Sequence, residues 1–389
     1  MYNNPNPVIS HMISHGGGTV PEVAESLGVS IGTATKLISA LCEEGLVLDI
    51  GTVERGSGRK PHRYELNPAA AAFLGVDITE NAIGMGIVDL SGEMILPEVS
   101  IPFNLNDTPR SLSSLVSIIS SQLSQWEEYR GNIKMACANV SGRVNTSTGR
   151  SNTFFAFTQN PLSQVLSESI GVPFMLSNDT HSMAFASFVK GGLPPEMGNV
   201  IFINLNWGLG VGIFLEGKPY LGKSGYAGEF GHVYGYDNEI LCRCGKKGCL
   251  ETEISGQAFC RNLTERIRGG ESSILGPRVL DRQEPLTLPE AMDALKKEDI
   301  LCIEVMENIG QELGKHIAGL MNLFNPDLVV IGGALADAGE YLLQPLKISV
   351  NKYCLQLVNQ DTEIRLSSLH GGSGVLGACL VARSRYYGG

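Results

Sequence analysis

The hydrophobic pattern of the first 50 residues has the period of two short helices. In TVPEVAESLG, residues 19–28, apolar side chains recur at the spacing of one helical face. A glycine-containing turn follows, and Ser30 is a favoured N-cap for a second amphipathic helix over residues 31–46. The two helices predict a helix-turn-helix, whose second helix enters the major groove of DNA. Paired short helices are equally common in proteins that do not bind DNA.

A basic hairpin pattern follows these helices. Residues 47–50 and 64–66 are strand-like, and the segment between them, GTVERGSGRKPHR, contains four basic residues. Such a hairpin is typical of the wing of a winged helix, whose tip contacts phosphates or a narrow minor groove. The hairpin favours DNA binding over the plain helix pair. The sequence therefore predicts a winged helix-turn-helix domain over residues 1–67.

The predicted DNA contacts are the polar residues opposite the apolar stripe of the second helix and the basic residues of the hairpin. They are Thr33, Thr35 and Lys36 in the helix, and Arg55, Arg59, Lys60 and Arg63 in the hairpin. One such module makes few base contacts, so proteins of this kind usually bind two DNA half-sites with two modules. We therefore expect a homodimer or tetramer on a double-stranded DNA operator.

From residue 68 onward, strand-like runs alternate with helical patterns. Strands are expected at 72–79, 82–90, 93–101, 133–140, 173–177, 199–205, 211–215 and 328–331. Helices are expected at 112–126, 162–170, 180–189, 300–324 and from about 338. This alternation predicts an α/β body over residues 68–389, made of two similar lobes at about 68–190 and 191–389.

Composition limits the possible partners and the compartment. With 29 basic and 40 acidic residues, the net charge of −11 argues against non-specific nucleic-acid binding by the whole chain. No apolar run is long enough to span a membrane, and the N-terminus lacks the pattern of a signal peptide. We therefore expect a cytoplasmic protein with no membrane partner. Nine dispersed cysteines fit reduced thiols and a metal cluster better than a disulfide framework.

The densest group of metal-ligating residues lies in GEFGHVYGYDNEILCRCGKKGCLE, residues 228–251. There His232 precedes Cys242, Cys244 and Cys249. Three thiolates and one imidazole are the ligand set of a closed, tetrahedral zinc site. Buried or disulfide-bonded cysteines are the alternative, but such cysteines seldom cluster this densely with glycines between them. The sequence therefore predicts a structural Zn²⁺ held by these four residues.

The same segment resembles the ROK family of sugar kinases and sugar-responsive repressors. In that family G-E-x-G-H precedes C-x-C-G-x-x-G-C-x-E, and both halves are present here at 228–232 and 242–251. The resemblance covers nearly all of residues 73–382 and implies a duplicated actin-like, ribonuclease-H-like ATPase-type fold. It implies that His232 both ligates the metal and faces a sugar, and that Glu229 and Glu251 bond sugar hydroxyls. The repressors of the family carry a winged helix at this end, and the kinases lack it.

Two shorter motifs resemble other sugar contacts of the family. Asn178 and Asp179 follow an apolar strand, and in the family this Asn holds a sugar hydroxyl while the Asp is the catalytic base. A plain helix N-cap is the alternative for Asp179. Gly142 and Arg143 resemble the loop over the sugar ring, for which a surface turn is the alternative. Together these residues predict a pocket for a monosaccharide or sugar phosphate.

Both phosphate-binding loops of the family's kinases are altered. The D-x-G-G-T loop is replaced by DITEN at residues 77–81, and G-T-G-x-G-x-G by NWGLGVG at 206–212. Lost glycines prevent close backbone approach to phosphate, Glu80 adds repulsion, and Trp207 is too large for a phosphate cleft. Phosphoryl transfer depends on that cradle. We therefore expect no kinase activity, with Asp179 kept as a vestigial base that accepts a hydrogen bond.

These patterns favour a sequence-specific transcriptional regulator, a repressor of carbohydrate-metabolism genes controlled by a bound sugar. The alternative is an ATP-dependent kinase of a hexose or N-acetylhexosamine with an added N-terminal domain. That alternative depends on Asp179. A constitutive DNA-binding protein with a vestigial body is disfavoured, because the sugar-facing residues are kept while the phosphate loops are not.

Overall fold

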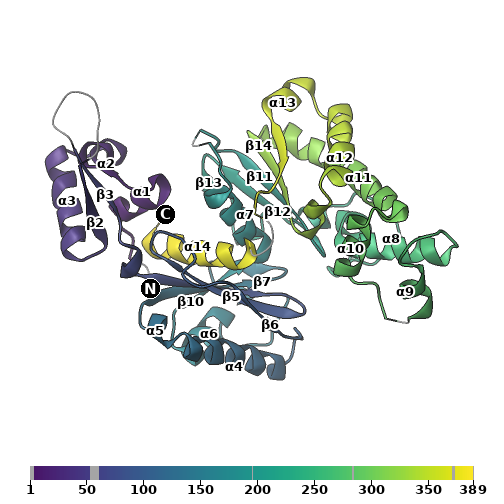
Figure 1. Ribbon diagram of the computed structural model, residues 1–389, viewed down its shortest axis with the longest axis horizontal. Coiled ribbons are helices and arrows are strands. Elements are labelled where there is room, and N and C mark those ends of the chain that lie inside the picture. Colours follow the sequence, from purple (N-terminus) through teal and green to yellow (C-terminus); the bar gives the residue numbers. More distant parts are fainter. Residues whose placement is uncertain (1–3, 53–60, 195, 283, 370–372, 389) are drawn as a thin grey trace. The chain divides into compact units, whose positions relative to one another are not determined.

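The computed structural model describes residues 4–52, 61–194, 196–282, 284–369 and 373–388 (Figure 1). The chain forms two compact units. The first unit comprises residues 1–189 and 372–389, and the second comprises residues 190–371. Among the described residues, no helix is both long enough and apolar enough to cross a bilayer.

The N-terminal part of the first unit contains three helices and a small antiparallel sheet. Its elements are α1 (Pro7–His15), β1 (Gly18–Thr19), α2 (Val20–Leu27), α3 (Ile31–Glu43), β2 (Val47–Thr52) and β3 (His62–Leu66). The strand order is β1-β3-β2. Both predicted helices and both predicted hairpin strands are present, whereas α1 was not predicted.

Local capping explains where these helices begin. The Thr19 backbone N–H donates to Glu22 Oε2 at 2.8 Å, which completes a capping box at the start of α2. Ser30 Oγ accepts from the Thr33 N–H at 3.1 Å at the start of α3.

The apolar stripe of α3 is narrower than the sequence predicts. Ala34, Ile38 and Leu41 are buried, but Leu37 is 38% exposed because it lies at the edge of that stripe. The helix also ends at Glu43, before the predicted residue 46.

Each unit contains one five-stranded sheet, and the two sheets have the same topology. The first holds β4 (Ala72–Ile78), β5 (Ala82–Asp89), β6 (Val99–Pro102), β7 (Ile133–Val140) and β10 (Phe174–Asn178), in the order β10-β7-β4-β5-β6. The second holds β11 (Val200–Leu205), β12 (Leu209–Leu215), β13 (Lys218–Pro219), β14 (Leu328–Gly332) and β15 (Glu363–Leu366), in the order β13-β12-β11-β14-β15. In both sheets three antiparallel strands are followed by two parallel ones. The expected duplication of an α/β unit is therefore present.

Helices cover these sheets. The first unit has α4 (Pro109–Gln125), α5 (Glu127–Arg130), α6 (Leu162–Ile170), α7 (Asp179–Lys190) and α14 (Ser373–Tyr387), together with the short strands β8 (Val144–Asn145) and β9 (Arg150–Ser151). The second has α8 (Gly256–Arg268), α9 (Gly276–Asp281), α10 (Leu288–Lys296), α11 (Ile300–Phe324), α12 (Glu340–Tyr353) and α13 (Gln356–Asp361). In Figure 1, α4 and α6 lie on one face of the first sheet and α14 lies on the other.

The last helix belongs to the first unit, although the sequence-based division placed residues 372–389 in the second lobe. It packs against β4, β5 and β7. A glycine permits this close contact, since a Cβ on Gly75 would lie 2.4 Å from the Val375 carbonyl oxygen. On α14 itself, a Cβ on Gly377 would lie 2.1 Å from the Ser182 carbonyl oxygen, so this glycine permits close approach to α7. The chain therefore returns to its first unit after completing the second.

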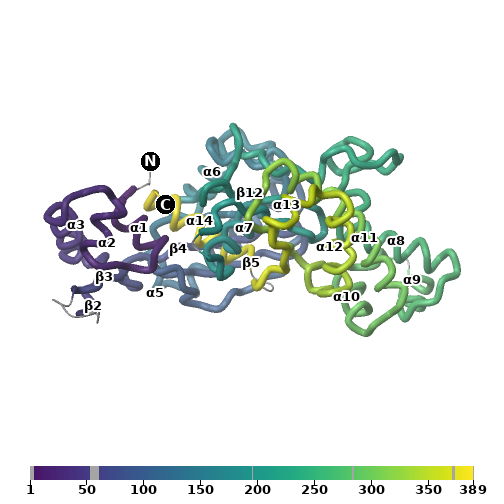
Figure 2. The backbone as a smooth tube through the Cα atoms, turned by 90° about the horizontal axis from the view of Figure 1, so that it is seen from above, coloured from purple at the N-terminus to yellow at the C-terminus, as the bar shows by residue number. Residues whose placement is uncertain are grey.

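The end of α14 also contacts the N-terminal helices. The backbone N–H groups of Asn4 and Asn6 donate to the carbonyls of Tyr386 and Tyr387 at 2.7 and 3.0 Å. Figure 2 shows α1 near the end of α14. A single buried apolar cluster includes Ile9 of α1, Phe73 of β4 and Tyr387 of α14, so the N-terminal helices share a core with the first sheet.

Candidate functional site

The four predicted metal ligands come together in the second unit. The ligand atoms of His232, Cys242, Cys244 and Cys249 all lie within 4.8 Å of one another. Cys242 Sγ is 3.5 Å from His232 Nδ1, and Cys244 Sγ is 3.6 Å from Cys249 Sγ. Zinc–sulfur bonds in a tetrahedron place ligand atoms about 3.8 Å apart. The cluster can therefore hold a metal ion.

Tight turns between the cysteines set this spacing. Gly245 and Gly248 have φ values of +86° and +76°, which residues with a side chain rarely adopt. A Cβ on Gly248 would lie 2.3 Å from the Tyr236 carbonyl oxygen. The chain can therefore return from Cys244 to Cys249 within five residues only because glycines occupy these positions.

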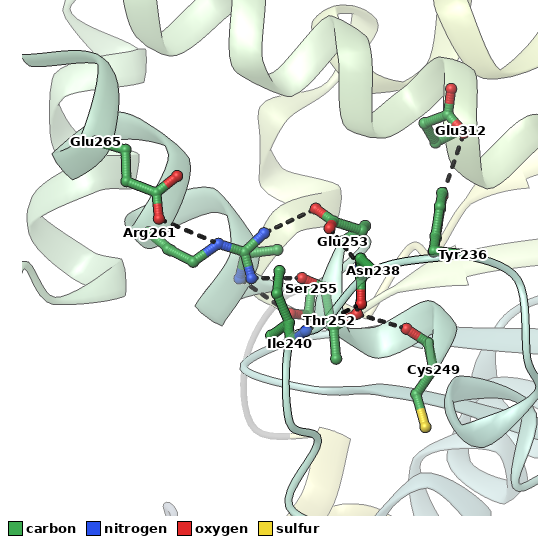
Figure 3. A network of polar contacts seen from close by, with 11 residues as sticks. Tyr236, Asn238, Ile240, Cys249, Thr252, Glu253, Ser255, Arg261, Glu265 and Glu312 are labelled. Atoms are coloured by element: carbon green, nitrogen blue, oxygen red, sulfur yellow. Dashed lines mark hydrogen bonds and ion pairs between the residues drawn. The ribbon is translucent and has the colours of Figure 1, made fainter. Parts of the chain in front are cut away.

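A polar network fastens the ligand loop to α8 (Figure 3). Thr252 Oγ1 donates to the Cys249 carbonyl at 2.7 Å, and Asn238 Nδ2 donates to Glu253 Oε1 at 2.7 Å. Arg261 of α8 donates to the Thr252 carbonyl at 2.6 Å and to Glu253 Oε2 at 2.7 Å. Arg261 therefore fixes Thr252, and Thr252 in turn holds the backbone of Cys249.

A second contact fastens the loop to α11. The Tyr236 hydroxyl donates to Glu312 Oε2 at 3.2 Å (Figure 3). Burial, together with the neighbouring Glu312 carboxylate, raises the pKa of Tyr236, so the phenol stays protonated and acts as the donor.

The two ring nitrogens of His232 have different neighbours. Nδ1 lies beside Cys242, and Nε2 is 3.6 Å from Glu229 Oε2. Glu251 Oε1 lies 3.6 Å from Cys242 Sγ, and its other oxygen accepts from the Leu209 N–H at 3.3 Å. Three residues predicted to contact a sugar therefore lie beside the cysteine cluster: Glu229, His232 and Glu251.

The other predicted sugar contacts lie together in the first unit. β7 and β10 are parallel neighbours, with Val140 opposite Asn178, so their carboxyl ends meet at one edge of the sheet. Asn178 Nδ2 donates to the Gly142 carbonyl at 2.9 Å, and Ser141 Oγ donates to Asp179 Oδ2 at 2.9 Å. Arg143 follows in the same loop and is exposed.

Asn178, rather than Asp179, caps α7 with its side chain. Asn178 Oδ1 accepts from the His181 N–H at 3.2 Å. Both polar atoms of the Asn178 amide therefore bond to backbone, which fixes the Gly142 loop against the start of α7. Sequence reasoning missed this positioning role, because Gly142 lies 36 residues earlier in the chain.

The first altered phosphate loop is a closed hairpin turn. Thr79 Oγ1 donates to the Ala82 carbonyl at 2.9 Å and accepts from the Ala82 N–H at 3.1 Å. The carbonyls of Glu80 and Asn81 accept from the backbone of residues 105 and 103.

In the second altered loop, backbone N–H groups donate hydrogen bonds to acceptors within the protein. The Asn206 N–H bonds to the Gly208 carbonyl at 3.0 Å, the Trp207 N–H to Asn206 Oδ1 at 3.0 Å, and the Leu209 N–H to Glu251. A Cβ on Gly208 would lie 2.6 Å from Glu251 Oε2, so a carboxylate lies directly against this loop. Three N–H groups that would face phosphate in a cradle are bonded within the protein.

A polar chain runs behind the first loop. Ser182 Oγ donates to Asn139 Oδ1 at 2.6 Å, and Asn139 Nδ2 donates to Asp77 Oδ1 at 3.0 Å and to the Gly374 carbonyl at 2.8 Å. Desolvation raises the pKa of Asp77 to about 6; the Asn139 hydrogen bond opposes this, and the charges of Asp179 and Glu98 add to it.

The residues predicted to contact DNA differ in their exposure. Three of them are exposed on α3: Thr33, Thr35 and Lys36. Arg63 is partly buried, and its guanidinium donates to Glu65 Oε1 and to the Gly16 carbonyl, each at 3.0 Å. It is therefore held against its own module. The remaining three lie outside the described residues: Arg55, Arg59 and Lys60.

Two sheets of identical order, with a cysteine–histidine loop in the second unit, define a duplicated α/β body. The chain belongs to the ROK family, whose family model matches residues 73–385.

Similarity to regulators extends over nearly the whole chain. The xylose repressor of Caldicellulosiruptor bescii is 23% identical over 363 residues, which is 92% of this chain and 89% of the repressor. The solved structure of a ROK family transcriptional regulator, a homolog of the Escherichia coli Mlc protein, has a TM-score of 0.82 and 25% identity, and covers 98% of this chain and 95% of its own.

Similarity to kinases is higher in identity but shorter. The glucokinase of Halalkalibacterium halodurans is 30% identical over 313 residues, which is 78% of this chain and 93% of the enzyme.

Proposed function

We propose that this chain is a sequence-specific DNA-binding repressor of carbohydrate-metabolism genes, controlled by a bound sugar. The observation that carries the proposal is the extent of similarity. The regulator structure covers 98% of the chain, whereas the glucokinase match spans 78% of it. The α/β body alone is common to kinases and repressors, so the N-terminal module distinguishes the two classes.

The N-terminal module is proposed to be a winged helix-turn-helix that binds a double-stranded DNA operator. Its support is the order of α1, α2, α3 and the β2–β3 hairpin, with exposed polar residues on α3. Helix α3 would enter the major groove, with Thr33, Thr35 and Lys36 facing it. A homodimer or tetramer would bring two such helices to two half-sites.

The effector is proposed to be a monosaccharide or sugar phosphate. In the first unit the proposed contacts are Gly142, Arg143 and Asp179, with Asn178 as their positioning residue. In the second unit, taken by itself, the residues proposed to bond sugar hydroxyls are Glu229, His232 and Glu251. Carboxylates accept hydrogen bonds from vicinal hydroxyls, and a buried hydroxyl needs such a partner.

The metal is proposed to be a structural Zn²⁺. Three thiolates and an imidazole leave no open coordination position, and that donor set suits zinc. The ion would fix the orientation of His232 and stiffen the loop that carries Glu229 and Glu251.

Sugar kinase activity is the second candidate, because the glucokinase relative is 30% identical and Asp179 is kept. Against it stand the closed turn at Thr79 and the internal bonding of the Asn206–Leu209 loop. Without donors free to neutralise phosphate, in-line transfer loses its main source of transition-state stabilisation.

A gel-shift assay on the DNA upstream of the protein's own gene tests the proposal. The assay is repeated with xylose, glucose, N-acetylglucosamine, their phosphates, and ATP with each sugar. We expect retarded DNA that one sugar or sugar phosphate releases without ATP. Sugar-dependent ATP consumption in the absence of DNA binding would establish the kinase instead.

A further inference from the structure

The outer surface of α3 offers few groups that can hydrogen-bond a base edge. Its sequence, IGTATKLISALCE, contains no Arg, Asn or Gln, the residues that make bidentate contacts to guanine or adenine. Lys36 is its single basic residue. Lys36 can contact guanine O6 and N7, so base discrimination by the rest of this helix needs another kind of contact.

The two threonine hydroxyls near the start of α3 are already bonded within the helix or to its N-cap. Thr35 Oγ1 donates to the Ile31 carbonyl at 2.8 Å. Thr33 Oγ1 lies 2.9 Å from Ser30 Oγ, which also accepts the Thr33 N–H. A hydroxyl carries one proton, so Thr35 has none left for a base acceptor while that bond is kept. What these threonines can still offer a base pair is an acceptor oxygen and a methyl group.

Ile31 is an exposed apolar residue at the start of the same helix. It directly follows the N-cap Ser30 and is 61% exposed. The core face of α3 is formed by residues further along, so Ile31 does not contribute to it. In helix-turn-helix proteins the N-terminal residues of the second helix contact base edges. The apolar group available there is the thymine 5-methyl group.

We propose that α3 recognises its operator through thymine methyl groups, with Ile31 making the principal contact. Thr35, four residues later, lies on the same side of the helix and adds its own methyl group. This inference rests on the proposed function, which supplies the DNA. It names the chemistry by which α3 selects its site, a thymine facing the first turn of the helix.

Uracil substitution isolates this contact, because uracil lacks only the 5-methyl group and pairs as thymine does. Sites are first selected from a random double-stranded DNA pool with the full-length protein. Each thymine of the selected site is then replaced singly by deoxyuridine, and affinity is measured by fluorescence anisotropy at one fixed salt concentration. The same series is measured with Ile31→Ala and with Ile300→Ala. Ile300 is a matched control, since it is also an exposed isoleucine at the first position of a capped helix.

We expect at least one deoxyuridine position to weaken binding about four-fold, the effect of one buried methyl group. Ile31→Ala should abolish the dependence at that position, and Ile300→Ala should retain it. Sequence-selective binding that tolerates every deoxyuridine would overturn this inference alone, as would a methyl dependence that survives Ile31→Ala. Failure to select any sequence would overturn the repressor proposal, and this inference with it.

Discussion

Single side chains in this protein hold two parts of the chain at once. The Asn178 amide bonds to Gly142 and to the start of α7, and His232 lies between Cys242 and Glu229. Such residues transmit the position of one group to another, because neither partner can move without disturbing the contact that joins them.

Removing one metal ligand should affect both stability and effector response. Cys244→Ala leaves three ligands, and we expect it to lower the melting temperature by about 5 to 10 °C and to abolish sugar-dependent release of DNA. Metal content by atomic absorption and thermal unfolding check this outcome. Cys354→Ala, outside the cluster, is the control. A Cys244→Ala protein that keeps both properties would contradict the structural-metal proposal.

The raised pKa of Asp77 makes stability depend on pH. Because its folded-state pKa of about 6 lies above the ordinary aspartate value of 3.8, the folded protein binds the proton more tightly than the unfolded chain does. The stabilisation is complete below pH 4 and is lost as the pH rises through about 6, amounting to at most about 3 kcal/mol.

Asp77→Asn should remove this pH dependence. The Asn carbonyl can still accept from Asn139, so the variant should unfold at higher urea than the parent at pH 8 and at similar urea at pH 4. Asp361→Asn, at an exposed position, provides the comparison. Equal pH profiles for Asp77→Asn and the parent would show that this carboxyl is not the cause.

At the scale of elements, glycines set how closely α11 approaches α12. A Cβ on Gly314 would lie 2.4 Å from the Leu346 carbonyl oxygen, whereas one on Gly319 of the same helix meets no atom within 4 Å. Gly314 is therefore needed for packing, and Gly319 is a weak point in an exposed stretch of helix.

Opposite effects are expected from the same substitution at these two positions. Gly314→Ala should destabilise the protein by about 1 to 3 kcal/mol through overpacking, and Gly319→Ala should stabilise it by about 0.5 to 1 kcal/mol through helix propensity. Urea midpoints of the two variants give the comparison. A stabilising Gly314→Ala would mean that α12 can shift away without cost.

The sequence predicts those elements whose signals are local. The cysteine–histidine cluster was predicted because its residues lie within one short segment, and α11 because its apolar period is long. Helix α14 was missed because it is buried on nearly every side and shows no polar face. Helix α1 was missed although Val8, Ile9 and Met12 have helical spacing, because it is short.

For the site, sequence patterns predict which residues gather in each unit but not what they bond. The engagement of Asn178 with Gly142, and of Glu251 with Leu209, joins segments 36 and 42 residues apart. Such long-range pairs depend on strand order, which a single sequence does not specify.

At the scale of the whole molecule, the first and last helices share one core. Tyr387 is 2% exposed, and its carbonyl accepts from the Asn6 N–H and from Ser10 Oγ, both at 3.0 Å. Within the first unit, the N-terminal module is therefore joined to the first sheet at residues 67–72 and again through α14.

Removal of residues 386–389 should loosen α1. The truncation deletes a buried aromatic side chain, whose burial contributes about 2 kcal/mol, and both carbonyl acceptors. We expect faster hydrogen exchange of the α1 amides with little change in α11. Removal of 388–389 alone is the control. Unchanged protection of α1 in the longer truncation would show that α14 does not hold it.

The contact between α1 and the end of α14 also affects the order in which the protein folds during its synthesis. Ribosomes add about 5 to 20 residues per second, so the last helix emerges about 20 to 80 seconds after the first. Until then Ile9 and Met12 lack the packing contacts that α14 adds to their cluster. The N-terminal module can therefore complete its core only after the rest of the chain has been synthesised. A chain that stops short of α14 would therefore leave α1 incompletely packed.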